Sequence, residues 1–413
     1  MQAASSDSAS ASAPAGGCPF SDDWCADHFD HVSPDLAQNL HETLAYMRAH
    51  HPVAHSEEHG GFWVVSRYED VLRVAQDWKT FSSAHGVSVP GNENVVKAIP
   101  EHLDPPLHRE YKRLINAFFT PAVVAGYEQP TRALVTGLID GFVEAGLSDF
   151  MADFARPFPG LAFFDLVLNA PSDRLAELND MATAVSVPNN PKRHEASQGL
   201  YAWIKDFLEA RRRQPSRGDV VDAVLAAEIE GRPITEDDAI AVVLLLILGG
   251  LETTAGALGQ FMLRFCREPE IPALLRRHPE RIPDAVEELL RLEPPFIAIA
   301  RTATADTEIG GRQVHKGDKL LIYWASANRD EGEFECPADF DLDRRSNRHL
   351  AFGAGPHRCA GSNLARLNLR IALEEVVWRL DDFRLQDDAE PVPFHSVLNR
   401  APLTVPITFT KRS

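Results

Sequence analysis

The chain has 413 residues, and its 41 lysines and arginines against 60 aspartates and glutamates give a formal net charge of −19. This acidic balance disfavours nucleic acid or an anionic membrane as the main partner, and the length suits a single large unit that can bury a cofactor. The five cysteines are scattered, odd in number and never spaced as CxxC. We therefore expect a reducing, cytoplasmic setting and no disulfide framework.

The N-terminal stretch 1–17 consists mostly of alanine, serine and glycine, without the basic and apolar regions of a signal peptide. We predict a disordered leader over 1–20 and a single catalytic domain over 21–413. The longest aliphatic run, 239–248, has about half the length that a bilayer span needs, so we expect no membrane anchor.

The N-terminal part of this domain combines helical and extended patterns. Residues 24–52 have helical spacing of apolar residues, 62–68 predict a strand with a following turn, and 69–76 predict a helix. The stretch 84–103 lacks periodicity and predicts a long loop, of the kind that covers binding sites in enzymes. Its valines, including Val87 and Val96, suit an apolar ligand.

A basic helix and a proline-interrupted helical region follow. His108 and Lys112 lie four residues apart in a helix predicted from 104 onwards, so they share one face, which is either solvated or directed at an anion. Residues 134–168 predict amphipathic helices that Pro157 and Pro159 interrupt. The polar stretch 186–194 predicts a linker between two helices that can act as a gate.

The next helix is long and carries two adjacent glycines. Thr235 is a predicted N-cap, and the helix runs through the aliphatic stretch to Gly249 and Gly250, each of which costs about 1 kcal/mol relative to alanine. Glycines in such a helix serve either close helix packing or the approach of a flat cofactor or diatomic molecule. Glu252 and Thr253 add an acid and an alcohol at this point.

Four further segments lie on either side of the last predicted long helix, three before it and one after it. Glu288 and Arg291, three residues apart, predict an ion pair on one helical face. Prolines at 294 and 295 predict extended chain in which Ile297 and Ile299 share one face. Residues 314–325 predict a strand with a turn at 317–318, and 396–398 predict a turn.

The stretch 352–361 ends in a cysteine that directly precedes a predicted helix over 362–380. A helix N-terminus favours a thiolate by lowering the cysteine pKa, and the glycines allow backbone N–H groups to approach the sulfur of Cys359. His357 and Arg358 add donors for carboxylates. The alternative is a structural cysteine beside an ordinary turn.

Phe352, Gly355, Cys359 and Gly361 form the pattern Phe-x-x-Gly-x-x-x-Cys-x-Gly, which resembles the haem-binding loop of the cytochromes P450. The resemblance extends over nearly the whole chain after the leader and indicates the soluble bacterial type. It implies a mainly α fold with a small β region, shaped as a triangular prism. Haem b would lie between the long distal helix and the loop and helix of the cysteine ligand.

The resemblance also implies roles for individual residues. Cys359 would be the axial ligand of the iron, and its thiolate would donate electron density that favours O–O cleavage. Thr253 and Glu252, where the family usually has aspartate, would deliver protons. The haem-contacting residues would be His108, Lys112 (arginine in the family), Arg301, His357, Phe352, Gly353 and Gly361. A structural network would contain Glu288, Arg291 and Arg344. The substrate pocket would contain Val87, Val96, Leu245, Leu248, Gly249, Ile297, Ile299, Val397 and Leu398.

The implied activity is a monooxygenase reaction that hydroxylates or dealkylates a mid-sized apolar molecule with O₂. Because the chain has no flavin or iron–sulfur motif, we expect electrons from a separate ferredoxin, reduced by ferredoxin reductase and NAD(P)H. An acidic ferredoxin would suit a basic patch formed by Arg73, Lys79, Arg109, Lys112, Arg113, Arg358 and Arg366. The alternatives are a peroxide-driven or rearranging haem-thiolate enzyme and a non-catalytic haem sensor.

Overall fold

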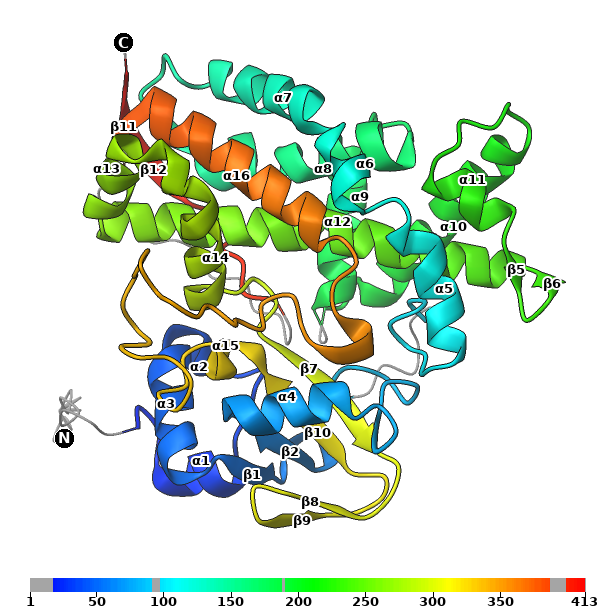
Figure 1. The fold of residues 1–413 in the computed structure, drawn as a ribbon, viewed down its shortest axis with the longest axis vertical. Helices are drawn as coiled ribbons and strands as arrows, with labels where there is room; N and C mark the ends of the chain where they lie inside the picture. Colours follow the sequence, from blue (N-terminus) through cyan, green and yellow to red (C-terminus); the bar gives the residue numbers. More distant parts are fainter. Residues whose placement is uncertain (1–17, 91–96, 188–189, 387–398, 413) are drawn as a thin grey trace, which may run out of the picture.

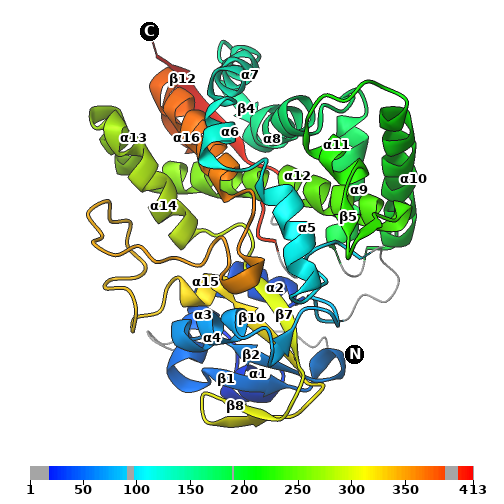
Figure 2. The same cartoon turned by 45° about the vertical axis from the view of Figure 1, so that its right-hand side comes forward.

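The computed structural model describes residues 18–90, 97–187, 190–386 and 399–412. The fold is mainly α with small β regions, as predicted. Most of the helices form one part of the molecule, and a smaller part combines the N-terminal helices with the largest sheet (Figure 1). Figure 2 shows the same division after a turn of 45°.

The helices and strands follow one another along the chain. The α-helices are α1 Asp22–Asp27, α2 Pro34–Gln38, α3 Leu40–His50, α4 Tyr68–Gln76, α5 Leu107–Asn116, α6 Pro121–Ala125, α7 Glu128–Asp140, α8 Pro157–Phe163, α9 Leu175–Ser186, α10 Arg193–Arg212, α11 Val220–Leu225, α12 Glu236–Arg267, α13 Glu270–Arg277, α14 Ile282–Leu292, α15 Trp324–Ala327 and α16 Ser362–Arg379. Shorter turns of 3₁₀ or π geometry are η1 Glu58–Gly60, η2 Met151–Ala155, η3 Phe164–Leu168, η4 Pro279–Arg281 and η5 Gly355–His357. The strands are β1 Val53–Ser56, β2 Phe62–Val65, β3 Phe81–Ser82, β4 Leu147–Asp149, β5 Glu228–Ile229, β6 Arg232–Pro233, β7 Ala298–Ala303, β8 Thr307–Ile309, β9 Arg312–Val314, β10 Lys319–Tyr323, β11 Leu380–Leu385 and β12 Pro406–Lys411.

The largest sheet has the order β1-β2-β10-β7-β3, with β2 and β10 parallel and the other pairs antiparallel. Its residues alternate between two hydrophobic clusters, because successive side chains of a strand point to opposite faces. Helix α4 packs on one face, and α1, α2 and α3 pack on the other. A second sheet, β11-β12-β4, lies near the C-terminus.

Helix α12 crosses the middle of the helical part (Figures 1 and 2). Its predicted start is confirmed, since the Thr235 side chain accepts a hydrogen bond from the backbone N–H of Asp238 at 3.1 Å. By length and composition α12 is a candidate membrane span, but 67% of its most apolar stretch is buried inside the protein. It is therefore the core of the largest hydrophobic cluster.

Two predicted helical regions differ from the structure. Residues 24–52 form α1, α2 and α3, and Pro34 begins the second of these at a position where a missing N–H costs nothing. The predicted break at Pro157 is present, because α8 begins there directly after η2, but Pro159 lies inside α8 and strand β4 also divides the predicted stretch 134–168. Most of the predicted leader, together with Val96, Val397 and Leu398, lies outside the described residues.

Candidate active site

The loop before α16 fixes the position of Cys359 through a backbone hydrogen bond and two glycines with positive φ. The backbone N–H of Cys359 donates to the Phe352 carbonyl at 2.8 Å, which closes the loop. Gly353 and Gly355 have φ of +66° and +67°, which favour glycine. A Cβ on Gly355 would also collide with the Ala75 carbonyl at the end of α4. The glycine at 355 therefore lets α4 and the loop pack together.

The charge on Cys359 depends on opposing effects. Burial raises the pKa of the thiol, whereas the Gly361 N–H and the positive charges of Lys112, Arg358 and Arg366 lower it. Burial is the largest of these effects, and the Gly361 N–H and the three cations oppose it. Cys359 retains exposed surface, so the sulfur-bearing residue is accessible in the structure.

Lys112 holds the loop in place from α5. Its Nζ donates to the Pro356 carbonyl at 2.7 Å and also to the Arg358 carbonyl. Burial lowers the pKa of Lys112 to about 8. The structure therefore gives Lys112 backbone partners, where the sequence predicted a haem propionate.

Three basic side chains gather beside this loop, and none of them forms an ion pair with a described residue, although Asp104 and Glu101 lie near enough to act on their charges. The His108 and His357 rings lie 4.2 Å apart, and His108 Nδ1 and His357 Nε2 are buried without a hydrogen-bond partner in the described chain. Burial and nearby cations lower the pKa of His108 to about 4 and that of His357 to about 2. Arg301 is buried, donates to the Ala300 carbonyl at 2.7 Å and forms no ion pair with the described residues. Such a cluster favours bound carboxylates.

Helix α12 has an accessible stripe in its otherwise buried middle. Leu245, Leu248, Gly249, Glu252 and Thr253 retain accessible surface, whereas the residues between them are largely buried. The spacing of three and four residues places the stripe on one face of the helix. The sequence-predicted pocket residues of α12 thus lie together along this stripe.

The two glycines of α12 have different surroundings. A Cβ on Gly250 would lie 2.7 Å from the Phe163 ring, so Gly250 allows close packing with α8. A Cβ on Gly249 would meet nothing within 4 Å. Thr253 Oγ1 donates to the Gly249 carbonyl at 3.0 Å, so the alcohol sits beside this open position. Gly250 therefore serves close helix packing, whereas the approach of a cofactor or diatomic molecule to Gly249 stays a prediction.

Glu252 is held by residues that the sequence did not identify. Its Oε2 accepts hydrogen bonds from Ser186 Oγ at 2.7 Å and from Asn399 Nδ2 at 2.9 Å. Burial raises the pKa of Glu252, although these hydrogen bonds and one from Thr183 oppose the rise. No local sequence signal points to Ser186 or Asn399, because both contacts join distant parts of the chain.

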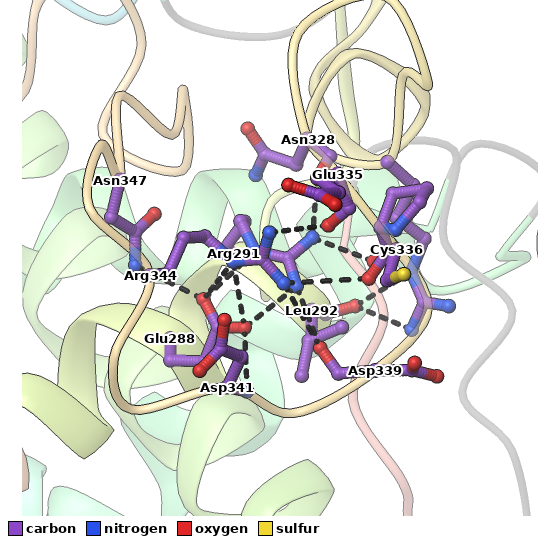
Figure 3. Close-up of polar contacts among 12 residues, drawn as sticks. Glu288, Arg291, Leu292, Asn328, Glu335, Cys336, Asp339, Asp341, Arg344 and Asn347 are labelled. Carbon is purple, nitrogen blue, oxygen red and sulfur yellow. Dashed lines mark hydrogen bonds and ion pairs between the residues drawn. The ribbon is translucent and has the colours of Figure 1, made fainter.

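A buried ion-pair network lies under the segment that leads to the cysteine loop (Figure 3). The Glu288 carboxylate accepts two hydrogen bonds from Arg291, at 2.8 and 2.9 Å, and one from Arg344 Nε at 3.1 Å. Asn347 and the backbone N–H of Asp341 complete its partners, each at 3.1 Å. The contact predicted between Glu288 and Arg291 is therefore present, and Arg344 joins it.

Three of the predicted substrate-pocket residues, Val87, Ile297 and Ile299, lie at the largest sheet, but not all on the same face of it. Val87 and Ile299 are buried in the cluster on the α4 face of the sheet, but Ile297 packs in the cluster on the opposite face. The prediction that Ile297 and Ile299 share a face is wrong, because β7 begins only at Ala298 and regular alternation does not extend to Ile297.

These features fit the haem that the resemblance implies. Haem carries two propionates, which match the basic group of His108, His357 and Arg301 with its unpartnered buried ring nitrogens. Its flat ring matches the open position at Gly249, and its iron matches the cysteine sulfur of the loop.

Comparisons with known proteins agree with this fit. The family model described as Cytochrome P450 matches residues 163–405. The steroid C26-monooxygenase of Mycobacterium tuberculosis strain H37Rv is 33% identical over 88% of this chain and 92% of its own length. Linalool 8-monooxygenase of Pseudomonas putida is 32% identical over 86% of this chain and 93% of its own length. The structure of CYP109Q5 from Chondromyces apiculatus matches with a TM-score of 0.84 at 31% identity, covering 94% of this chain and all of that one.

The family model, the relatives and the fold agree with the cysteine loop, the buried basic group and the accessible stripe of α12. The chain therefore belongs to the cytochrome P450 family and is a monooxygenase that binds haem b.

Proposed function

We propose that this enzyme inserts one oxygen atom of O₂ into a mid-sized apolar molecule, with electrons from a separate ferredoxin. The observation that carries the proposal is the accessible stripe of α12, where the Thr253 hydroxyl lies beside the open position at Gly249. A helix that served only packing in the core would be expected to bury an apolar side chain at this position, not to present an accessible alcohol.

The residues around the proposed haem site have three different roles: they ligate the iron, bind the propionates or hold the ligand loop. When bound, haem supplies an iron centre that activates O₂ with two electrons. Cys359 supplies the sulfur ligand, and His108, His357 and Arg301 bind the propionates. Lys112 holds the ligand loop through its carbonyls.

Thr253 and Glu252 handle protons in this proposal. The Thr253 hydroxyl holds a proton at Oγ1, which it directs at the Gly249 carbonyl in the resting protein. Glu252, with its raised pKa, retains a proton at higher pH than an ordinary glutamate, so it can act as a donor nearer neutral pH. Its hydrogen bonds to Ser186 and Asn399 aim Oε2 at α9 and the C-terminal segment.

The proposed substrate class rests on the apolar lining of the stripe. Leu245 and Leu248 offer no charge to anchor a polar group. The two named relatives act on a steroid and on linalool, which are both apolar molecules of moderate size. We therefore expect a steroid-like or terpenoid-like substrate.

The electron donor would dock on the side of the ligand loop. Arg109, Arg113 and Arg358 are exposed there, whereas Arg366 forms a bidentate pair with Glu287 at 2.7 Å. Arg73 and Lys79 of the predicted patch are exposed as well. The proposed ferredoxin contact therefore rests on these two residues and the three arginines, and its rate should fall as the salt concentration rises.

Three measurements test the proposed function. The reduced protein should bind carbon monoxide with the far-red Soret band typical of a sulfur-bound ferrous haem, and Cys359→Ala should lose that band. A panel of steroids and terpenoids should shift the haem spectrum of the oxidised enzyme. The compounds that do so should be oxygenated only with NAD(P)H, ferredoxin reductase and ferredoxin. Product formed with peroxide alone at the same rate would instead favour a peroxide-driven enzyme.

A further inference from the structure

Three side chains with metal-ligating atoms meet in the N-terminal part of the protein, outside the haem site. Asp30, His31 and His59 each offer one ligand atom, and these atoms lie within 4.8 Å of one another. Asp30 and His31 follow α1, and His59 lies in η1 between β1 and β2. The two imidazole rings have centroids 5.0 Å apart and lie at 74° to each other.

His31 is prepared for metal binding by its surroundings. Only 7% of the residue is exposed, and its Nε2 donates to the Val89 carbonyl at 2.5 Å. A carbonyl can only accept, so the proton of a neutral ring is on Nε2 and the lone pair is on Nδ1. Nδ1 is buried and has no hydrogen-bond partner among the residues that the structure describes.

An unpartnered buried nitrogen is costly unless something binds it. Protonation would not help, because the second N–H would also lack an acceptor and a charge would be buried. An imidazole that donates one nitrogen to a backbone carbonyl and presents the other is the usual arrangement of a metal-bound histidine. The same hydrogen bond fixes the tautomer and the orientation of the ring.

The other two groups are closer to solvent and already interact. His59 Nε2 lies 2.7 Å from Asp30 Oδ1, and their side chains are 19% and 32% exposed. The carboxylate also accepts the Val32 N–H at 3.0 Å, which holds it in place. A cation can enter from this side, replace the proton shared by Asp30 and His59, and keep a water as a further ligand.

We propose that Asp30, His31 and His59 bind a divalent transition-metal ion, with Zn²⁺ as the best match. Two imidazoles and a carboxylate form a donor set that zinc accepts in tetrahedral sites with one bound water. Ligand atoms at about 2.1 Å from zinc lie roughly 3.4 Å apart, so each pair in the cluster needs to move by no more than about 1.5 Å. The ion would also anchor His31, and through it Val89, which lies within the predicted substrate loop 84–103.

Zinc binding by the untagged, haem-loaded protein tests this site. After treatment with a chelator, the protein should take up one zinc per chain in calorimetric titration with zinc chloride, and metal analysis should find it beside one haem iron. His59→Ala and Asp30→Asn should each weaken binding by at least about tenfold. The matched control is His315→Ala, since exposed His315 lies 3.7 Å from Asp306 in an ordinary surface pair, and its affinity should be unchanged.

The carbon monoxide spectrum and circular dichroism show whether each variant is folded. If His59→Ala does not fold, the zinc affinity of Asp30→Asn, which retains the shape of the side chain, tests the site. The proposal is overturned if the protein binds no zinc, or if zinc binds equally well to the variants and to the wild type. Anomalous diffraction at the zinc edge gives an independent answer, because a zinc ion found elsewhere also contradicts the proposal. None of these measurements depends on a substrate or on turnover.

Discussion

At the scale of single residues, neighbouring positions of α12 have sharply different environments. The Glu252 carboxylate is held by three hydrogen-bond donors, from Ser186, Asn399 and Thr183. The Thr253 hydroxyl instead donates only to the Gly249 carbonyl of its own helix among the described residues. A carboxyl group with a raised pKa and an alcohol that can rotate are complementary, because one stores a proton and the other can pass it on. Their roles can therefore be separated by experiment.

Thr253→Ala should uncouple electron consumption from product formation. The substitution removes the hydroxyl that donates to the Gly249 carbonyl and leaves the rest of the helix intact. We expect NADH consumption to continue while product per NADH falls on the order of tenfold or more, with peroxide or water formed instead. The control is Thr254→Val, which changes the adjacent, buried threonine. Unchanged product yield in Thr253→Ala would remove the threonine from the proton path.

The raised pKa of Glu252 predicts how stability depends on pH. Below the range of an ordinary glutamate, about pH 4.3, the carboxyl is protonated in both the folded and the unfolded protein. As pH rises, the unfolded state loses its proton first, so this group destabilises the fold increasingly until the pH passes its folded pKa. Glu252→Gln lacks this loss, and its stability relative to the wild type should increase with pH. Urea unfolding at several pH values measures the difference, and a difference that is constant or falls with pH would contradict the raised pKa.

At the scale of elements, α12 shows what a sequence can and cannot specify about a site. Its start could be predicted, because the Thr235 cap is a local interaction. The partners of Glu252 could not, since Ser186 and Asn399 are 66 and 147 residues away and only the tertiary fold brings them to it. The face of the sheet on which a side chain lies likewise depends on where β7 begins. Because β7 begins at Ala298, the alternation assumed for Ile297 does not hold, and its face was predicted wrongly.

The glycine pair gives a matched test of α12 packing. Gly250→Ala places a Cβ 2.7 Å from the Phe163 ring, and we expect this overpacking to cost about 1–3 kcal/mol, of which the better helix propensity of alanine returns about 1 kcal/mol. Gly249→Ala meets no protein atom within 4 Å and should keep the stability or improve it, but should alter the haem spectrum with substrates. Denaturant unfolding and spectral titration of both variants separate the two effects. Equal loss of stability in both would mean that Gly249 is also a packing residue.

At the scale of the whole molecule, the Glu288 network joins α14 to the long segment before the ligand loop. Arg291 donates to the carbonyls of Asn328, Pro337 and Asp339 at 2.7 to 3.1 Å, so irregular chain that lacks its own hydrogen-bond ladder is held by one guanidinium (Figure 3). Glu288 and Arg291 are almost completely buried, so their charges depend on each other. The resemblance suggested such a network, but only the structure identifies the carbonyls that it serves.

Glu288→Gln should therefore destabilise the whole protein. The amide has nearly the shape of the carboxylate but leaves the buried guanidinium groups of Arg291 and Arg344 without a countercharge, which costs about 3–5 kcal/mol when one partner of a buried pair is removed. The matched control is Glu177→Gln, because Arg174 and Glu177 form another pair three residues apart, with side chains 48% and 47% exposed. That variant should unfold at nearly the wild-type urea concentration, since water replaces the lost contact. Similar midpoints for the two variants would show that burial of the Glu288 network contributes little. A lower midpoint in Glu288→Gln, with earlier release of haem, would show that the network holds the ligand loop in place.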